Sequence, residues 1–320
     1  MTAQIKKKVE AIGLIPVITL PDVSQSEALA DALVQGGIPI AEVTFRAEGA
    51  EQAIARIRKH NPHMLTGAGT VLTIEQAERA MGAGAQFIVA PGLSPRVVEY
   101  CLKRETLVIP GISTPSELSL ALEYGLDTVK FFPAEQNGGV AGVMALAGPF
   151  PNVRFVITGG VNKDNLAGYL SCDKVAACGG TFMVGGHIVN REWEKLTALC
   201  RECVRIAHGF SIAHVGVNTA DEAEATAAAN QFASLLGLPA KAGNSSIFVD
   251  TAIEVMKTTY LGAHGHIAIK TNSLRRAMAY LEETGVALRM DTLKTNQKGA
   301  PASVYLEREI AGFAMHLLQA

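Results

Sequence analysis

The most constraining feature of this chain is a regular alternation, up to about residue 207, of short apolar runs with segments of helical periodicity. Successive runs lie roughly 20 to 25 residues apart and end at or near glycine, proline or threonine. We interpret eight runs as strands: 14–20, 40–45, 65–71, 87–92, 107–112, 128–133, 154–160 and 174–180. Eight strand–helix units in about 200 residues predict a compact TIM (β/α)8 barrel, whose functional groups lie at the carboxyl ends of the strands.

Composition and motifs narrow the alternatives. A doubly wound open sheet would alternate in the same way, but no glycine fingerprint of a dinucleotide site follows the first run. A net charge of -2, without a basic stripe or an acidic tail, gives no reason to expect nucleic-acid or membrane partners. No apolar run is long enough to span a bilayer, and no signal-peptide cleavage site follows the lysines at 6–8. Five cysteines without framework spacing fit a reducing cytoplasm.

Lys130 is a lone lysine in the apolar run 128–133. Inside a low-dielectric strand the neutral amine is favoured over the ammonium ion, and a neutral lysine can attack a carbonyl group to form a Schiff base. The alternative is a structural lysine whose ammonium group pairs with a carboxylate at a strand end. The other polar residues of the predicted barrel favour the catalytic interpretation.

Two earlier strands carry polar groups toward the same end of the predicted barrel. Glu42, Thr44 and Arg46 share one face of the second strand by its two-residue period. The third strand ends in the stretch 67–70, where small residues let a ligand approach the backbone and Thr70 offers a hydroxyl group. A buried ion pair and an ordinary turn are the structural alternatives.

The last two strands end in glycine pairs. Gly159 and Gly160 end the seventh strand, and Gly179 and Gly180 end the eighth, before Thr181. In this fold, the loops after the last two strands commonly hold a phosphate group through backbone N–H groups. We therefore predict a phosphate site here, with ordinary turns as the alternative.

Six motifs of this region also carry a resemblance to a known family. They are Glu42–Arg46, Gly67–Val71, Ala90–Gly92, Pro110–Gly111, Lys130–Ala134 and Gly179–Thr181. In this order they resemble the motifs of the 2-keto-3-deoxy-6-phosphogluconate (KDPG) and 4-hydroxy-2-oxoglutarate (KHG) aldolases. The resemblance covers residues 1 to about 207.

The resemblance implies a trimeric class I aldolase on a TIM barrel that needs no cofactor. It implies Lys130 as the Schiff-base lysine and Glu42 as the general acid/base, with Arg46 and Thr70 binding the pyruvate carboxylate. Its motifs place further substrate contacts at Pro91, Phe132, Gly159, Gly160, Gly180 and Thr181. Members that act on phosphorylated sugar acids commonly have serine where this chain has Thr181, which adds a methyl group to the pocket.

The chemistry of aldol cleavage needs these residue types. Breaking the C3–C4 bond of a 2-keto-4-hydroxy acid leaves carbanion charge at C3, which a protonated imine on Lys130 would spread. The Glu42 carboxylate would take the proton of the C4 hydroxyl group. The planar guanidinium of Arg46 would hold the substrate carboxylate through paired donors.

A second domain begins near residue 208, after the amphipathic stretch 192–208, so we predict domains of 1–207 and 208–320. The second half contains an internal repeat, because His214–Val217 and His266–Ile269 each open a strand followed by a helix and further strands. We expect an α+β domain of two βαβββ modules. Over residues 210–320 it resembles the vicinal-oxygen-chelate superfamily, to which glyoxalase I belongs.

The second resemblance implies a divalent metal held by the first and last strands of each module. The matching positions are His214 and Glu254 in one module and His266 and His316 in the other. Imidazole and carboxylate ligands suit Zn, Ni, Fe or Mn. His316 stands where glutamate is commoner, and many members have lost the metal, so a binding module without chemistry is the alternative.

We therefore expect a cytoplasmic class I aldolase that acts on small 2-keto acids as a homotrimer or higher homo-oligomer. Its expected reactions are cleavage of KDPG to pyruvate and glyceraldehyde 3-phosphate, and of KHG to pyruvate and glyoxylate. The alternative substrate is the isomer 2-keto-3-deoxy-6-phosphogalactonate, which the sequence does not separate from KDPG.

Overall fold

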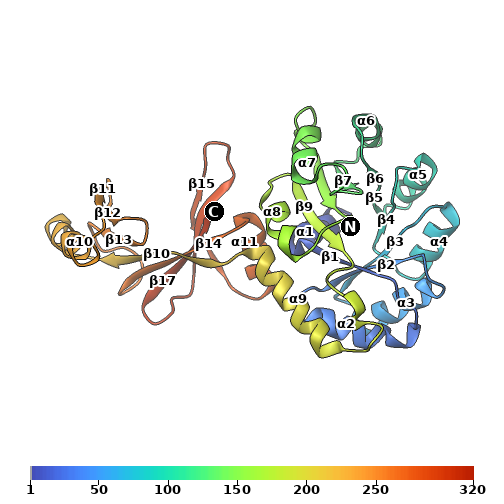
Figure 1. Cartoon of the computed structure of the whole chain (residues 1–320), viewed down its shortest axis with the longest axis horizontal. Coiled ribbons are helices and arrows are strands. Elements are labelled where there is room, and N and C mark those ends of the chain that lie inside the picture. Colours follow the sequence, from blue (N-terminus) through green and yellow to red (C-terminus); the bar gives the residue numbers. More distant parts are fainter. Residues whose placement is uncertain (1) are drawn as a thin grey trace. The chain divides into compact units, whose positions relative to one another are not determined.

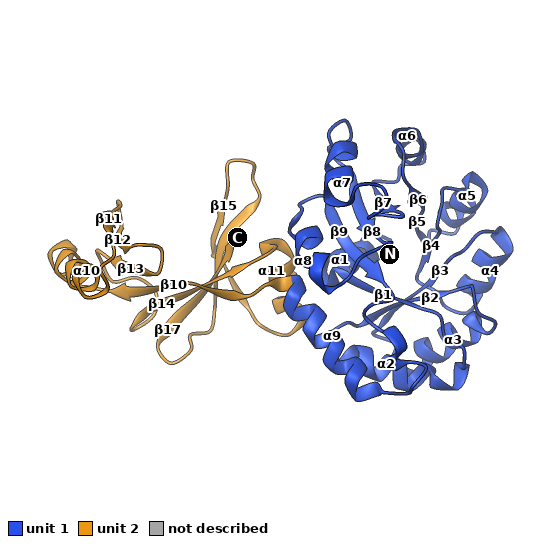
Figure 2. Ribbon diagram, in the orientation of Figure 1, with its two compact units in different colours: residues 1–207 blue, residues 208–320 orange. Residues whose placement is uncertain are grey.

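The structure, a computed structural model, describes residues 2–320. The chain divides into two compact units, Met1–Ala207 and His208–Ala320 (Figure 2). Across the described residues, none of the helices combines the length and the apolar character needed to cross a membrane.

The first unit alternates strands and helices. Its strands are β1 (Leu14–Ile18), β2 (Ile40–Thr44), β3 (Leu65–Gly69), β4 (Phe87–Val89), β5 (Leu107–Ile109), β6 (Gly111–Ile112), β7 (Thr128–Phe131), β8 (Arg154–Ile157) and β9 (Val175–Gly180). Its helices are α1 (Thr2–Ile12), α2 (Ser26–Gln35), α3 (Ala50–His60), α4 (Ile74–Gly82), α5 (Pro95–Lys103), α6 (Pro115–Glu123), α7 (Gly139–Ala147), α8 (Lys163–Ser171) and α9 (Trp193–His208). Short 3-10 turns lie at Val23–Gln25 and Gly185–His187.

These strands form one barrel-like parallel sheet. Within residues 2–207, nine strands are paired in the order β5-β4-β3-β2-β1-β9-β8-β7-β6. Only Pro110 separates the two strands at the ends of this order, so the chain itself joins the edges of the sheet. Figure 1 shows helices α2, α3, α4 and α5 on the outside of strands β1 to β4. An α/β architecture of this kind is what the alternation predicts.

The strands differ from the predicted runs mainly at their ends. Each of the eight runs contains a strand, but the fifth is divided into β5 and β6 because Pro110 has no N–H group for the ladder. Several strands also end earlier than predicted: β1 at Ile18, β4 at Val89 and β8 at Ile157. After β4 and β8 the chain leaves the sheet and forms loops that carry predicted site residues, Pro91 in one and Gly159 and Gly160 in the other.

The core of the first unit lies between the sheet and the helices. Apolar side chains from all the strands and most helices form one continuous buried cluster, which includes an edge-to-face pair of Phe131 and Phe155 with ring centroids 6.3 Å apart. Helix α8 begins where Asn162 accepts hydrogen bonds from the backbone N–H groups of Asp164 and Asn165. This cap fixes the entry of the chain into α8 directly after the Gly159–Gly160 loop.

The second unit contains the order strand, helix, three strands, twice over. Its strands are β10 (Ser211–Asn218), β11 (Ala240–Ala242), β12 (Ser246–Val249), β13 (Ile253–Met256), β14 (Gly265–Thr271), β15 (Leu288–Thr295), β16 (Pro301–Leu306) and β17 (Phe313–Gln319). Its helices are α10 (Glu222–Leu236) and α11 (Leu274–Glu283).

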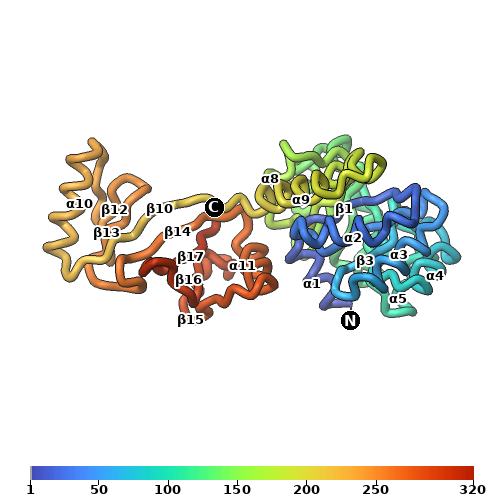
Figure 3. Tube along the Cα trace, turned by 90° about the horizontal axis from the view of Figure 1, so that it is seen from below, coloured from blue at the N-terminus to red at the C-terminus, as the bar shows by residue number. Residues whose placement is uncertain are grey.

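Residues 208–320 form a separate eight-stranded sheet in the order β11-β12-β13-β10-β14-β17-β16-β15. The antiparallel pair β10 and β14 joins the two halves at its centre. Helix α10 lies against β12 and β13, and α11 against β14, β16 and β17 (Figure 3). Each helix covers a small apolar cluster of its own.

Candidate functional site

Lys130 is the third residue of β7 and is buried, with 7% of its surface exposed. Its backbone N–H donates to Pro110 O at 2.8 Å, and its Cα pairs in register with Gly111 and Val156. The ammonium nitrogen lies 5.0 Å from the ring centroid of Phe132, a cation–π distance. The strand thus holds the Lys130 side chain in a buried position beside an aromatic ring.

Glu42 lies in β2 and is buried, with 1% of its surface exposed. Burial raises the pKa of the Glu42 carboxyl above its usual range, and the charges of Lys130 and Arg46 only partly oppose this effect. A carboxyl group with a raised pKa, on which a nearby lysine charge acts, is suited to general acid/base catalysis.

The small residues of β3 make room for this carboxylate. A Cβ atom on Gly69 would lie 2.1 Å from Glu42 Oε1, and one on Gly67 would lie 2.3 Å from a ring carbon of Phe87. The sequence predicted that small residues here let a ligand approach the backbone. In the structure both glycines accommodate protein side chains.

The structure corrects the placement of Arg46. Strand β2 ends at Thr44, so Arg46 lies in the following turn and is exposed rather than on the buried face of the strand. Thr44 stays buried and donates its hydroxyl hydrogen to Ile18 O at 3.0 Å. The two-residue period failed because it was extended past the end of the strand. Arg46 nevertheless lies close enough for its charge to act on Glu42.

Thr70 follows β3 in a left-handed backbone conformation, with φ 57°. This conformation is rare for a β-branched residue and persists only where the surroundings hold it, which is common at functional sites. Pro91 is half-buried, and its carbonyl oxygen would lie 2.1 Å from a Cβ on Gly111. Phe132 is exposed beside Lys130.

The two glycine loops lie where β8 and β9 end. Gly159 and Gly160 both have left-handed φ angles, 91° and 86°, which only glycine adopts without strain. Next to Gly180, the ring of Phe182 occupies the place of a Cβ, and the exposed Thr181 accepts a hydrogen bond from the Gly185 N–H group at 2.7 Å.

The second unit brings its four predicted ligands together. His214 lies in β10, Glu254 in β13, His266 in β14 and His316 in β17. The Nε2 atoms of the first two histidines are 3.2 Å apart, and each is 3.1 Å from Glu254 Oε2. The three histidines offer nitrogen atoms within 4.8 Å of one another.

The donor set fits a divalent metal. Both ring nitrogens of His316 are buried and have no hydrogen-bond partner within residues 2–320, so one of them is available to bind an ion. Ser246 donates its hydroxyl hydrogen to Glu254 Oε1 at 2.6 Å, which leaves Oε2 facing the histidines. A Cβ on Gly216 would lie 2.0 Å from His266 Cε1, so that glycine makes room for the ring.

The electrostatics of the cluster favour metal-binding protonation states. Burial raises the pKa of the Glu254 carboxyl, but hydrogen bonds from its two histidine neighbours and from Ser246 outweigh burial and hold the pKa well below its usual range. Burial, together with the charges of the other two histidines, lowers the pKa of His316 to about 3. A charged carboxylate and a neutral imidazole are the forms that bind metals.

Sequence reasoning missed three neighbours of this cluster. They are Ser246, Gly216 and Tyr305. The ring of Tyr305 stacks on the ring of His316, with centroids 4.6 Å apart. A serine, a glycine and a tyrosine on strands carry no local signal of this role, because their partners lie on other strands.

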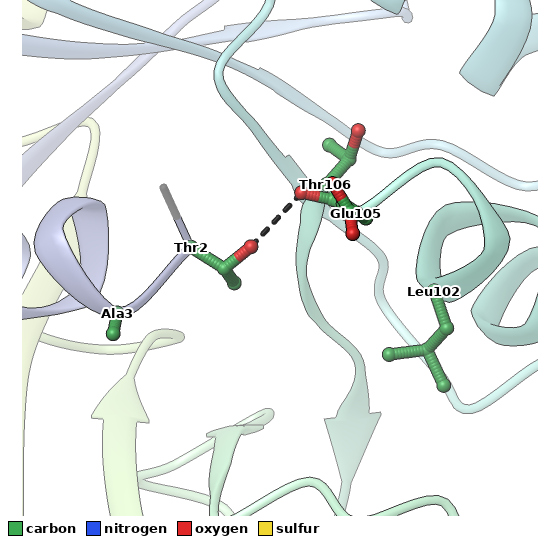
Figure 4. Close-up of a pocket in the computed structure, with 5 residues that line it drawn as sticks. All are labelled: Thr2, Ala3, Leu102, Glu105 and Thr106. Atoms are coloured by element: carbon green, nitrogen blue, oxygen red, sulfur yellow. Dashed lines mark hydrogen bonds between the residues drawn. The ribbon is translucent and has the colours of Figure 1, made fainter.

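A pocket lined by Thr2, Ala3, Leu102, Glu105 and Thr106 lies away from the candidate site (Figure 4). There the Thr2 hydroxyl donates to Glu105 O at 2.9 Å. Glu105 and Thr106 directly precede β5, and Thr2 and Ala3 begin α1, so the pocket is at the amino end of β5 and plays no part in the predicted chemistry.

Comparisons with known proteins place this geometry in context. Residues 5–199 match the model of the family described as KDPG and KHG aldolase. A 2-dehydro-3-deoxy-phosphogluconate aldolase of Treponema pallidum is 49% identical over 198 residues, which cover 62% of this chain and 94% of the relative. A KHG/KDPG aldolase of Escherichia coli K12 is 42% identical over 192 residues, or 60% of this chain and 90% of the relative.

A solved structure is also similar. It is a KDPG aldolase from Legionella pneumophila with pyruvate captured as a covalent carbinolamine intermediate, 38% identical, with a TM-score of 0.60. The match covers 61% of this chain and 96% of that chain. The family match lies within the first unit, and the three other matches cover 60–62% of this chain.

Proposed function

The chain belongs to the KDPG and KHG aldolase family, and we propose that it cleaves KDPG to pyruvate and glyceraldehyde 3-phosphate. It is a lyase, as its named relatives are. Cleavage of KHG to pyruvate and glyoxylate is a further reaction of the same site, supported by the E. coli relative named for both substrates. The observation that carries the proposal is that Lys130 and Glu42 are both buried and that the charge of Lys130 acts on the Glu42 carboxyl group, whose pKa is raised.

In the proposed mechanism, the Lys130 amine attacks the C2 carbonyl group of the substrate, and water leaves to give a protonated imine. Glu42 then accepts the proton of the C4 hydroxyl group while the C3–C4 bond breaks. The electron pair of that bond moves into the imine and leaves an enamine, and the aldehyde product departs. Protonation of C3 and hydrolysis of the imine release pyruvate and restore Lys130.

The remaining residues bind the two ends of the substrate. Arg46 and Thr70 hold the pyruvyl carboxylate, and Pro91 and Phe132 line the apolar wall beside Lys130. The phosphate contacts are Gly159, Gly160, Gly180 and Thr181, mostly through backbone N–H groups. The aldolase chemistry requires no metal or cofactor. We also propose that the first unit is a closed TIM barrel and that the protein is a cytoplasmic homotrimer.

The experiment that tests this function combines trapping with an assay of substrates. Pyruvate and borohydride should add about 72 Da, the mass of a reduced three-carbon imine, to the Lys130 peptide and inactivate the enzyme. EDTA should not stop aldol cleavage. Pyruvate release from KDPG, KHG and 2-keto-3-deoxy-6-phosphogalactonate would rank the substrates. Labelling at another lysine, or loss of cleavage in EDTA, would contradict the Schiff-base assignment.

For the second unit we propose a vicinal-oxygen-chelate type domain with one divalent metal held by His214, Glu254, His266 and His316. The convergence of their side-chain atoms supports it. A bound ion would act as a Lewis acid toward oxygen atoms of a small molecule. Metal analysis of the full chain, after growth with Zn, Ni, Fe and Mn, should find close to one ion per chain. Less than about one ion per two chains would favour a binding module without chemistry.

A further inference from the structure

Glu135 lies in the turn between β7 and α7 and contacts both glycines of the candidate phosphate loop. Its backbone N–H donates to Gly159 O at 3.1 Å. A Cβ on Gly160 would lie 2.3 Å from Glu135 Cγ, so the Glu135 side chain packs directly on that glycine. Its carboxylate accepts a hydrogen bond from the Tyr169 hydroxyl group of α8. One residue thus joins the turn after the Schiff-base strand, the loop and the following helix.

These contacts set the direction of the N–H groups of the loop. In a trans peptide the N–H of one residue points opposite to the C=O of the residue before it. Because Gly159 O faces Glu135, the N–H of Gly160 points away from Glu135. Gly160 O accepts a hydrogen bond from Asn165 Nδ2 at 3.0 Å, so the N–H of Val161 points away from α8. Within residues 2–320 neither N–H group donates a hydrogen bond, so both are available to an outside acceptor.

Tyr169 secures this arrangement from the helix side. Helical side chains tilt toward the amino end of their helix, so a tyrosine two turns into α8 reaches back toward the loop that precedes it. Tyr169 is buried, with 1% of its surface exposed, whereas the Glu135 residue as a whole is exposed. The hydroxyl group of a buried tyrosine thus holds the carboxylate of an exposed residue.

We propose that Glu135, held by Tyr169, is a positioning residue that fixes the Gly159–Gly160 loop in its phosphate-binding conformation and so gives the aldolase its preference for phosphorylated 2-keto acids. The inference rests on the proposed function. The proposed role of Glu135 differs from a general structural role, because a change at Glu135 should affect only the binding of the phosphate end of the substrate. The carboxyl end and Lys130 are held by other residues.

The test is steady-state kinetics of Glu135→Ala and Tyr169→Phe with a phosphorylated and an unphosphorylated substrate. Each variant should raise KM for KDPG about ten-fold, the loss expected for one hydrogen bond to a charged group, with kcat changed less than about two-fold. KM for KHG, which has no phosphate, should change less than about two-fold. Glu135→Gln keeps an acceptor oxygen for Tyr169 and should restore most of the affinity for KDPG.

The chain offers a matched control. Tyr124 donates its hydroxyl hydrogen to Glu99 Oε1 at 3.0 Å, in an exposed pair that joins the end of α6 to the middle of α5. Glu99→Ala and Tyr124→Phe remove the same chemistry elsewhere and should leave both KM values unchanged. A rise in KM for both substrates alike, or tighter binding of KDPG after loss of the Glu135 charge, would overturn the positioning role.

A second measurement separates this inference from the proposed function. Inorganic phosphate should raise the Tm of the wild-type protein and raise it less for Tyr169→Phe, whichever substrate the enzyme cleaves. If the wild type cleaves none of the acids, the proposed function fails while the phosphate titration still tests the loop. Equal shifts of Tm in the wild type and the variant would refute the loop assignment alone.

Discussion

Replacement of Glu42 by glutamine separates the catalytic role of this residue from its effect on stability. The side chain is buried in β2, and burial raises the pKa of its carboxyl group against the opposing charges of Lys130 and Arg46. Glutamine has nearly the same shape, so the space beside Gly69 stays filled. The variant cannot accept a proton or carry a charge, and both consequences can be measured.

The catalytic consequence is a loss of proton transfer without loss of the imine. General acid–base catalysis contributes roughly 100-fold to 10,000-fold, so kcat of Glu42→Gln should fall at least about 100-fold, or about 2.7 kcal/mol. Pyruvate and borohydride should still add about 72 Da at Lys130, because the lysine itself makes the bond. In the wild type, the acid limb of the kcat profile should lie above the usual range of a glutamate, since cleavage needs the carboxylate.

Although Glu42→Gln should lower turnover, it should raise the stability of the folded protein at high pH. The folded-state pKa of Glu42 is raised above 4.5, so its favourable contribution is present below pH 4.5 and is lost as pH rises through the folded-state pKa. Above that pKa the loss is constant, at about 1.4 kcal/mol for each unit by which the folded-state pKa exceeds the unfolded one. Glu42→Gln avoids this loss, so it should be more stable than the wild type at pH 8, with a smaller difference at pH 5.

Urea unfolding at pH 5 and pH 8 gives the measurement. The single tryptophan, Trp193, packs against the core of the first unit, so its fluorescence reports on that unit. Glu48→Gln, in the exposed loop after β2, is the matched control and should change neither turnover nor stability beyond about 0.5 kcal/mol. Wild-type turnover in Glu42→Gln, or a variant less stable than the wild type at pH 8, would refute the reasoning.

Two further predictions use glycines that make room for functional side chains. In Gly69→Ala, the new Cβ would lie 2.1 Å from Glu42 Oε1 and displace the carboxylate, so kcat should fall at least about ten-fold. Gly82→Ala, in open space at the end of α4, is its control, and equal activity of the two variants would contradict this account. In Gly216→Ala, the Cβ would lie 2.0 Å from His266 Cε1, so bound metal per chain should fall while aldol cleavage is unchanged. Full metal content in that variant would count against the cluster as the metal site.

Local patterns predict the main elements of the first unit because burial of a sheet between helices imposes the observed periodicity. Each of the eight apolar runs contains a strand, and Lys130 is a buried residue of β7, in the run where the sequence places it. The family resemblance, which was predicted from motifs that are contiguous in the chain, is likewise confirmed over residues 5–199. Such features depend on neighbours within a few residues, so one sequence suffices to find them.

Only the tertiary structure shows where each strand ends and which side chains from neighbouring strands fill the space beside it. Periodicity does not show where a strand leaves its sheet, and so Arg46 was predicted on β2 but lies in the turn after it. Gly69 and Gly67 accommodate Glu42 and Phe87, and only the neighbouring strands supply that constraint.

In the second unit, too, the sequence shows which residues are present, but the pairing of distant strands determines which of them are close together. The residue types at 214, 254, 266 and 316 and the internal repeat are properties of the sequence, whereas the 3.2 Å between His214 and His266 is not. That distance exists because β10 and β14 pair antiparallel and Gly216 leaves space for the ring. A sequence specifies which side chains are available, but the register between distant strands determines which of them meet.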